Sequence, residues 1–187
     1  MGLTFICTPS HDYIQARTTY DLVNMVKSTP DCVFSIAQGT YINNLREGVV
    51  KGVCDLPATH LMFIDSDMMF PSNSLTRLLK HDKDIIGANY RTRIDPSKFT
   101  AKRGGLSLPL GTGIEEADTI GMGVTLIKMD VFKKMPQPWF NMSWNGKFYE
   151  GEDESFCNKA RLSGFSVWVD NELSKEVKHI GTVELGA

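Results

Sequence analysis

The chain has 187 residues, of which 42% are hydrophobic and 22% are charged, which is the size and composition of one globular domain. Its formal net charge of −2 gives no broad positive field, so we expect neither nucleic acid nor an anionic membrane as a partner. No apolar run approaches the roughly 20 residues of a membrane span, and the N-terminus lacks the pattern of a signal peptide, so a cytoplasmic protein is expected. The cysteines are widely spaced, without a Cys-x-x-Cys pair, and are expected to be reduced core residues: Cys7, Cys32, Cys54 and Cys157.

Strands and helices alternate through the first half of the chain. Its apolar residues form short runs, as in strands, or follow the 3.6-residue period of a helix. The predicted elements are a strand at 3–7, a helix from about 14 to Pro30, a strand at 33–37, a helix capped by Thr40, a strand at 61–64, a helix from 72 to about 80 and a strand at 85–88. This order is typical of an α/β protein, with a parallel sheet between two layers of helices.

The second half is less regular. Residues 91–118 are polar and rich in Gly and Pro, so loops or short strands are expected there. The later predicted elements are a strand at 124–127, a short helix at 131–135 capped by Asp130, a helix at 152–163 that ends before Gly164, and a strand at 165–169. We expect one domain over residues 1–187, with a nucleotide-binding half at about 1–90 and an acceptor and catalytic half at about 91–187.

Two carboxylates follow the most apolar of these strands. The run Leu-Met-Phe-Ile at 61–64 ends in Asp65-Ser66-Asp67, and Pro71 precedes the next helix. Ligands of open α/β sheets bind beyond the carboxyl ends of the strands, and acids are costly to bury there unless they are paired or hold a cation. Oxygen ligands at this place suit Mg²⁺ or Mn²⁺ bridging a diphosphate. The alternative is a surface turn that happens to contain two Asp residues.

Three further features lie in order along the chain: Thr8-Pro9-Ser10 after the first strand, Gly151-Glu152-Asp153-Glu154 at a helix start, and His179 after the last strand. Together with Asp65-Ser66-Asp67, this ordered set resembles the GT-A glycosyltransferases, especially the small family-2-like enzymes of bacteria and viruses. The resemblance covers most of the chain and also includes Gly121-Met122-Gly123, Pro138-Trp139-Phe140, the run from Gly151 to Cys157, and Gly164-Phe165.

The resemblance implies a single GT-A (Rossmann-like) domain, whose mostly parallel central sheet is flanked by helices. It further implies that Asp67 ligates the metal directly and that Asp65 contacts the metal through water, or else contacts the donor. By the same resemblance Asp153 is the catalytic base and His179 is a third protein ligand of the metal. Because Mn²⁺ accepts mixed carboxylate and imidazole ligands more readily than Mg²⁺, His179 favours Mn²⁺. A structural or surface histidine is the alternative for His179.

The chemistry suits these residue types. A divalent cation held by carboxylates neutralises a diphosphate leaving group, and a further carboxylate can take the proton of an acceptor hydroxyl. Helical spacing lets either Glu152 or Asp153 lean toward the interior, and only the resemblance selects Asp153. The alternative is that both are acids of a first helical turn, stabilised by the helix dipole.

Candidates for binding the donor lie at the ends of the first three strands. Thr8, Pro9 and Ser10 offer backbone groups and hydroxyls, Gln38 offers an amide for a base edge, and Asp65 and Ser66 lie beside the metal position. Ordinary loop chemistry is the alternative for Gln38 and for the loop at 8–10.

For three other features, the sequence is compatible with either a binding role or a purely structural one. Arg46 lies roughly opposite the apolar stripe of its helix and is either solvated or functional. A basic run either clamps a diphosphate or anionic acceptor or is a solvated loop: Arg91, Arg93, Lys98, Lys102 and Arg103. Three aromatic residues either stack on a sugar or pack in the interior: Trp139, Phe140 and Trp144.

The expected function is therefore a metal-dependent transfer of a sugar, with inversion, from a nucleotide-sugar (UDP- or GDP-sugar) to a hydroxyl of a glycan or another acceptor. One alternative is a nucleotide-sugar or glycan-binding module without turnover. The other is a sugar-nucleotide pyrophosphorylase, whose Gly-rich loop with a basic residue is not seen in Thr8-Pro9-Ser10-His11.

Overall fold

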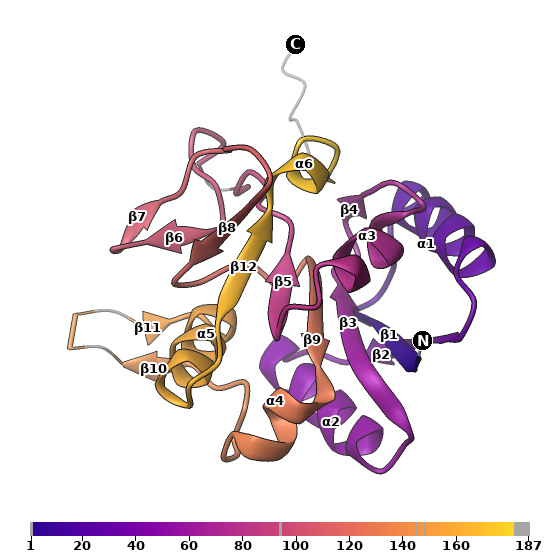
Figure 1. Cartoon of the computed structure of the whole chain (residues 1–187), viewed down its shortest axis with the longest axis horizontal. Coiled ribbons are helices and arrows are strands. Elements are labelled where there is room, and N and C mark those ends of the chain that lie inside the picture. The colour runs from indigo at the N-terminus through magenta and orange to yellow at the C-terminus, as the bar shows by residue number, and fades with distance from the viewer. Residues whose placement is uncertain (1, 94, 145, 148, 182–187) are drawn as a thin grey trace.

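A computed structural model of the chain describes residues 2–93, 95–144, 146–147 and 149–181. The main sheet has the spatial strand order β2-β1-β3-β9-β5-β12-β8 (Figure 1). Its strands are β2 (Cys32–Gln38), β1 (Leu3–Ser10), β3 (Ala58–Ile64), β9 (Val124–Lys128), β5 (Ile85–Gly87), β12 (Val167–Asp170) and β8 (Ile114–Ala117). The helices are α1 (Ala16–Ser28), α2 (Ile42–Cys54), α3 (Ser74–Lys80), α4 (Met129–Lys134), α5 (Glu152–Leu162) and α6 (Asn171–Ser174).

Most of the sheet is parallel, and the predicted α/β class is confirmed. Strands β2, β1, β3, β5 and β12 run in one direction, whereas β9 and β8 run in the opposite one. The simple strand–helix alternation did not reveal where β9 lies. This strand enters antiparallel between β3 and β5, so the fourth strand of the pattern does not pair with the third.

Short antiparallel pairs complete the described strands. They are β4 (Met68–Met69) with β13 (Lys178–His179), β6 (Lys102–Arg103) with β7 (Leu106–Ser107), and β10 (Ser143–Trp144) with β11 (Tyr149–Glu150). The first pair joins the segment after β3 to the segment that follows α6, and it matters most for the site.

The apolar residues of the sheet alternate between two cores. In β3, Leu61 and Phe63 point to the core under α2, α4 and α5, whereas Met62 and Ile64 point to the core under α1, α3 and α6. All four side chains are fully buried. A strand buried on both faces explains the unbroken apolar run in the sequence.

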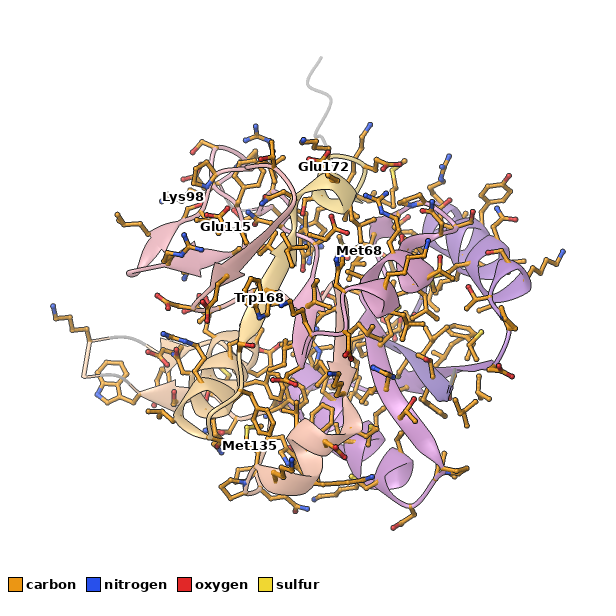
Figure 2. All side chains as sticks on the ribbon, in the orientation of Figure 1. Met68, Lys98, Glu115, Met135, Trp168 and Glu172 are labelled. Carbon is orange, nitrogen blue, oxygen red and sulfur yellow. The ribbon has the colours of Figure 1, made fainter. Side chains whose placement is uncertain are left out.

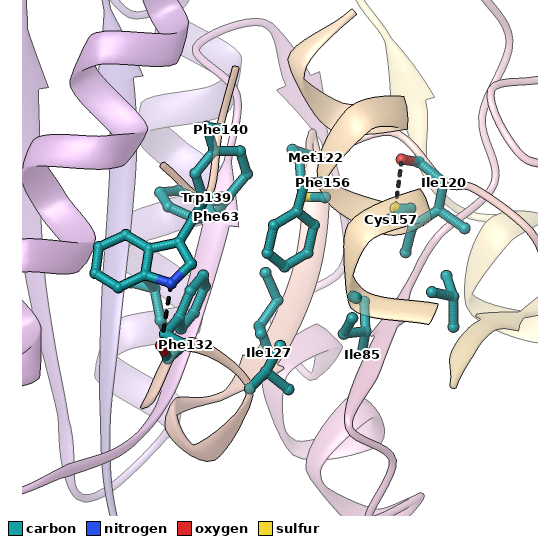
Figure 3. Packing of buried hydrophobic residues seen from close by; sticks show 14 of the residues in the cluster. Phe63, Ile85, Ile120, Met122, Ile127, Phe132, Trp139, Phe140, Phe156 and Cys157 are labelled. Carbon is teal, nitrogen blue, oxygen red and sulfur yellow. Dashed lines mark hydrogen bonds between the residues drawn. The ribbon is translucent and has the colours of Figure 1, made fainter. Parts of the chain in front are cut away.

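Aromatic rings fill the core under α2, α4 and α5 (Figure 3). Phe140 stacks on Phe156 with ring centroids 4.7 Å apart and meets Phe63 edge-on at 5.6 Å. The indole Nε1–H of Trp139 donates to the carbonyls of Phe132 and Met135, both at 3.0 Å. Trp139 and Phe140 are therefore packing residues, because they are only 4% and 2% exposed.

Several predicted boundaries move by a few residues. Helix α3 begins at Ser74 because Pro71 to Ser74 forms a turn closed by the Ser74 N–H to Pro71 carbonyl bond. Thr40 and Asp130 do not cap their helices: Tyr41 precedes α2, and Asp130 lies in the first turn of α4. Gly164 follows the C-cap residue of α5 and has a φ of 89°, which is the left-handed conformation expected of a glycine just past the end of a helix.

Two expectations from composition can be compared with the structure. The four cysteines are free, with Cys7 and Cys157 buried and Cys32 and Cys54 half-buried. Within the described residues, no helix combines the length and the apolar character needed to cross a bilayer.

Candidate active site

A cleft of about 320 Å³ opens at the carboxyl ends of β1, β2 and β3, where open α/β sheets bind their ligands. Residues from both halves of the sequence line it: Pro9, Ser10, His11, Gly39, Thr40, Ile42, Leu45, Arg46, Asp65, Ser66, Asp67, Arg93, Glu152 and Asp153. The fold thus brings the Asp-x-Asp segment and the start of α5 to the same place.

Arg46 joins these two segments. Its side chain, from α2, is 3% exposed; Nη2 donates to Asp65 Oδ1 at 2.7 Å, and Nη1 donates to Glu152 Oε1. Burial alone would lower the pKa of Arg46, but the carboxylates of Asp65 and Glu152 raise it above its ordinary value. Sequence reasoning left open a solvated arginine, and the structure instead shows a buried one that connects the end of β3 to α5.

Asp67 meets His179 through the pairing of two short strands. Met68 of β4 pairs with His179 of β13, and the Ile180 N–H donates to the Asp67 carbonyl at 2.8 Å. Asp67 Oδ2 consequently lies 3.4 Å from His179 Nε2 and 2.8 Å from Arg93 Nη1. Partial burial opposes ionisation of Asp67, but His179 and Arg93 together lower its pKa below the ordinary value.

His179 is oriented by its second ring nitrogen. Nδ1 lies 3.3 Å from the carbonyl of Arg91, which only accepts, so Nδ1 carries the proton. The ring of Tyr90 also meets the imidazole edge-on, with centroids 5.5 Å apart. Nε2 faces the Asp67 carboxylate, as a hydrogen-bond donor when it carries a proton and as a metal ligand when it does not, and a backbone carbonyl behind the ring is the usual partner of a metal-ligating histidine.

These donors suit a divalent cation. An Nε2 without a proton would repel Asp67 Oδ2 at 3.4 Å unless a cation lay between them, and neighbouring ligand atoms on one Mg²⁺ or Zn²⁺ ion lie about 3 Å apart. Among the described residues, no group of three or more His, Cys, Asp and Glu side chains is arranged to hold a metal. Asp67 and His179 converge, whereas Asp65 is engaged by Arg46. Water and ligand oxygens would have to supply the remaining positions around a cation.

The three acids that open α5 have different partners. Glu152 is bound by Arg46, and Glu154 by Lys102. Within the described part of the chain, Asp153 forms no ion pair, although its Oδ1 accepts the Glu154 N–H at 2.8 Å. Burial, and then the neighbouring Glu152 carboxylate, raise the pKa of Asp153 to about 6. Spacing could not choose between Glu152 and Asp153, and the ion pairs distinguish them.

Tyr90 lies beneath the site and explains the Gly121-Met122-Gly123 motif. Its hydroxyl accepts the Gly123 N–H at 2.8 Å, and a Cβ on Gly121 or Gly123 would come within 2.6 or 2.4 Å of that oxygen. Burial, and then the carboxylates of Asp65 and Asp153, raise the pKa of Tyr90 well above its ordinary value. Sequence reasoning did not single out Tyr90, because the residues it contacts are distant in the chain.

The remaining candidates for donor binding divide into two groups. Pro9, Ser10 and Ser66 line the cleft. Thr8 is fully buried, and its Oγ1 has no hydrogen-bond partner among the described residues. Gln38 is exposed and lines a separate groove between β2 and α2, beside the cleft rather than within it.

The basic run is mostly neutralised by nearby acids. Lys98 pairs with Asp95, Lys102 with Glu154, and Arg103 with Glu115; Lys98 and Glu115 lie on the side of the molecule that carries β6, β7 and β8 (Figure 2). Arg93 is the one of the five that lines the cleft. The third aromatic candidate, Trp144, is 58% exposed, and its ring centroid lies 5.1 Å from that of Tyr149.

A second cavity, of about 440 Å³, lies on the other side of Asp67. Its lining residues are His11, Asp12, Tyr13, Gln15, Ser66, Asp67, Arg93, Ile180 and Gly181. It shares His11, Ser66, Asp67 and Arg93 with the first cleft. Asp67 and Arg93 thus stand between two adjoining spaces that could each receive part of a ligand.

Comparison with solved structures identifies the fold. The crystal structure of A197 from STIV aligns with a TM-score of 0.68 at 15% identity, over 99% of this chain and 97% of that one. Two crystal structures of S. aureus TarS align with TM-scores of 0.55 and 0.51 at 12% and 13% identity. They are matched over 95% and 90% of this chain, which spans 60% of TarS 1-349 and 36% of the other TarS chain.

This likeness is one of fold, and the fold is the GT-A type. No family model matches the sequence, and no curated protein does. The glycosyltransferase-like fold is thus established by structure.

Proposed function

We propose that the chain is a divalent-metal-dependent glycosyltransferase that moves a sugar from a UDP- or GDP-sugar to a hydroxyl acceptor, with inversion. The observation that carries this proposal is the convergence of Asp67 Oδ2 and His179 Nε2, at 3.4 Å, beside a cleft that is lined by Asp67 and by Asp153, which has no ion-pair partner among the described residues. The GT-A fold supports it, because the cleft lies at the ligand-binding edge of the sheet.

In this proposal the described residues hold and orient the reactants. Asp67 and His179 hold Mn²⁺ or Mg²⁺, which when bound supplies positive charge to the diphosphate leaving group. Asp65, fixed by Arg46, faces the metal through water or faces the donor sugar. The rim formed by Pro9, Ser10 and Ser66 contacts the nucleotide.

Asp153 is the proposed base. Its carboxylate accepts the proton of the acceptor hydroxyl while the acceptor oxygen bonds to the sugar's anomeric carbon and the bond to the diphosphate breaks. A pKa of about 6 leaves it ionised at neutral pH and more basic than an ordinary aspartate, which is suited to this role. A binding module without turnover would have no use for such a group, so the enzyme is favoured over that alternative.

The proposal is tested by calorimetric titration of UDP and GDP with Mn²⁺, with Mg²⁺ and with a chelator. We expect Asp67→Asn to abolish the metal-dependent part of nucleoside diphosphate binding while the circular dichroism spectrum stays unchanged. Asp130→Asn, which changes a 68% exposed side chain on α4, is the matched control and should bind like the wild type. If Asp67→Asn binds nucleotide with wild-type metal dependence, the proposed site is wrong.

A further inference from the structure

Residues 91 to 93 contact both groups that would hold the metal. The carbonyl of Arg91 accepts from His179 Nδ1, and the guanidinium of Arg93 lies 2.8 Å from Asp67 Oδ2. Asp67 Oδ2 is also the oxygen that faces His179 Nε2. A cation bound between these two atoms would therefore lie next to the positively charged Arg93.

The two arginines of the cleft differ in how firmly they are held. Arg46 is 3% exposed and bound by two carboxylates, so its position is fixed by burial. The side chain of Arg93 is 60% exposed and has Asp67 as its one ion-pair partner among the described residues. Water can solvate its guanidinium when it leaves Asp67, whereas Asp67, whose side chain is 15% exposed, needs another cation in its place.

The backbone that carries Arg93 is better anchored than its side chain. The Thr92 N–H donates to the Lys98 carbonyl at 3.0 Å, Thr92 Oγ1 donates to the Asp95 carbonyl at 2.8 Å, and the Arg91 guanidinium lies over the Phe99 ring at 4.7 Å. A guanidinium released from Asp67 would thus stay beside the two cavities that Arg93 lines.

We propose that Arg93 is an exchangeable counter-ion: it neutralises Asp67 in the metal-free protein, leaves this carboxylate when a divalent cation binds, and then binds the donor diphosphate. This inference rests on the proposed function. A planar guanidinium matches two phosphate oxygens at once, which makes it a better diphosphate ligand than a lysine. Before the exchange, Arg93 neutralises Asp67. After the exchange, the metal neutralises Asp67, and Arg93 neutralises part of the negative charge of the diphosphate.

The first measurement uses the metal alone. Mn²⁺ binding, followed by electron paramagnetic resonance without nucleotide, should become about 3- to 10-fold tighter in Arg93→Gln, because the competing cation is gone. Arg93→Lys keeps the charge and should bind Mn²⁺ like the wild type. Arg103→Gln, whose guanidinium pairs with Glu115 outside the cleft, is the matched control and should also be unchanged.

The second measurement adds UDP or GDP, whichever the wild type binds, at saturating Mn²⁺. Arg93→Gln should weaken nucleoside diphosphate binding about 10- to 100-fold, as for the loss of a charge-assisted hydrogen bond. Binding of the corresponding nucleoside should be unchanged, because it lacks the phosphates. Arg93→Lys should lie between the wild type and Arg93→Gln.

The outcomes separate this inference from the function on which it rests. If the wild type binds Mn²⁺ and nucleotide but Arg93→Gln binds Mn²⁺ no more tightly, the counter-ion idea is overturned and the proposed function stands. Tighter Mn²⁺ binding without weaker nucleotide binding would overturn the diphosphate contact. If the wild type binds no divalent cation, both proposals fail.

Discussion

The acids of the cleft are distinguished by whether a cation already holds them. Asp65 and Glu152 are paired with Arg46, and Asp67 is paired with Arg93, whereas Asp153 forms no ion pair with a described residue. An unpaired carboxylate retains its basicity, and burial raises the basicity of Asp153 further. The candidate base is thus selected by its neighbours rather than by its own position in the helix.

Asp153→Asn is expected to lower kcat by about 10²- to 10⁴-fold and to leave donor affinity nearly unchanged, because the amide keeps the size of the carboxylate but cannot accept the proton. In the wild type, kcat should rise with pH through about 6, where Asp153 ionises, and then level off. Turnover with a measured donor–acceptor pair, together with NMR of the first product anomer, checks both points. Retained configuration, or near-normal turnover by the variant, would exclude this role.

The same side chain should make the protein less stable at neutral pH. Folding raises the pKa of Asp153 from 3.8 to about 6, so the folded state binds this proton more tightly than the unfolded state. This contribution to stability is complete below pH 3.8 and is lost as the pH rises through 6. Asp153→Asn should therefore be more stable than the wild type at pH 7.5, by up to about 3 kcal/mol, with the difference shrinking toward pH 4.

Urea unfolding of the wild type and of Asp153→Asn at several pH values measures this difference. Asp130→Asn, which changes an exposed carboxylate, is the control. The difference between its free energy of unfolding and that of the wild type should not depend on pH in this way. A difference for Asp153→Asn that stays constant from pH 4 to 8 would mean that the carboxyl is not destabilised by ionisation.

Arg46→Met should destabilise the protein by about 3 kcal/mol, because it leaves the carboxylates of Asp65 and Glu152 close together without their cation. Since Arg46 also lowers the pKa of Asp153, the pH–rate profile of this variant should move to higher pH. Chemical denaturation measures the first effect. The control Lys175→Gln breaks an exposed pair with Glu172 and should cost less than about 1 kcal/mol.

Sequence reasoning singled out the acids that line the cleft but missed what Arg46 does. Asp65, Asp67 and Asp153 are recognisable because acids beside apolar segments are unusual, and such a pattern is local. Arg46 follows Leu45 on a helix whose apolar stripe gives the direction of the core. The partner that buries Arg46 is Glu152, more than 100 residues later, and no local pattern carries that information.

At the scale of elements, Gly123 and Gly48 differ in whether the structure leaves room for a side chain. A Cβ on Gly123 would lie 2.4 Å from Tyr90 Oη and 2.8 Å from its ring carbon Cζ, whereas a Cβ on Gly48 of α2 would meet nothing within 4 Å. Gly123→Ala should therefore destabilise the protein by about 1–3 kcal/mol through overpacking. Gly48→Ala should stabilise it by roughly 0.5–1 kcal/mol, because alanine loses less backbone entropy in a helix.

The free energies of unfolding of both variants, measured in urea, check this difference in sign. A Gly123→Ala variant as stable as the wild type, or more stable, would contradict the packing around Tyr90, and a destabilised Gly48→Ala would contradict the open space around Gly48. A lowered Mn²⁺ affinity in Gly123→Ala would be a further consequence, because Tyr90 also contacts His179.

The elements themselves were predictable where the signal was local. The strands at β1, β2 and β3 and helix α5 follow from apolar runs, helical spacing and Gly164. The insertion of β9 between β3 and β5 was not predictable, since Val124–Lys128 carries the same apolar pattern whichever neighbours it takes. The pairing of β4 with β13 rests on two residues in each strand, too few for any periodicity, although it is what places His179 beside Asp67.

At the scale of the whole molecule, the site ties distant parts of the chain together. Its residues come from the end of β1, from α2, from the segment after β3, from the start of α5 and from β13. A ligand that contacts all of them stabilises the folded state against unfolding of any one.

The preferred nucleoside diphosphate at about 100 times its Kd should thus add roughly 2.7 kcal/mol of stability to the Mn²⁺-saturated protein. For a chain of this size, that corresponds to an increase in Tm of about 5–10 °C. Differential scanning fluorimetry measures the increase, and hydrogen exchange should slow at residues 177–180 as well as near Asp65. Asp67→Asn should lose the increase; an equal increase in that variant would place the ligand elsewhere.

The antiparallel entry of β9 also has a consequence during synthesis of the chain. β3 receives its neighbour on that side only when Val124 has been made, about 60 residues after Ile64, which at 5–20 residues per second takes about 3–12 s. Throughout that interval the Leu-Met-Phe-Ile run ends one side of a growing sheet with unpaired backbone groups. Asp65 and Asp67 directly follow this run, and charges in such positions discourage pairing with other nascent chains. The two carboxylates would therefore protect the unfinished protein from aggregation before they take part in any chemistry.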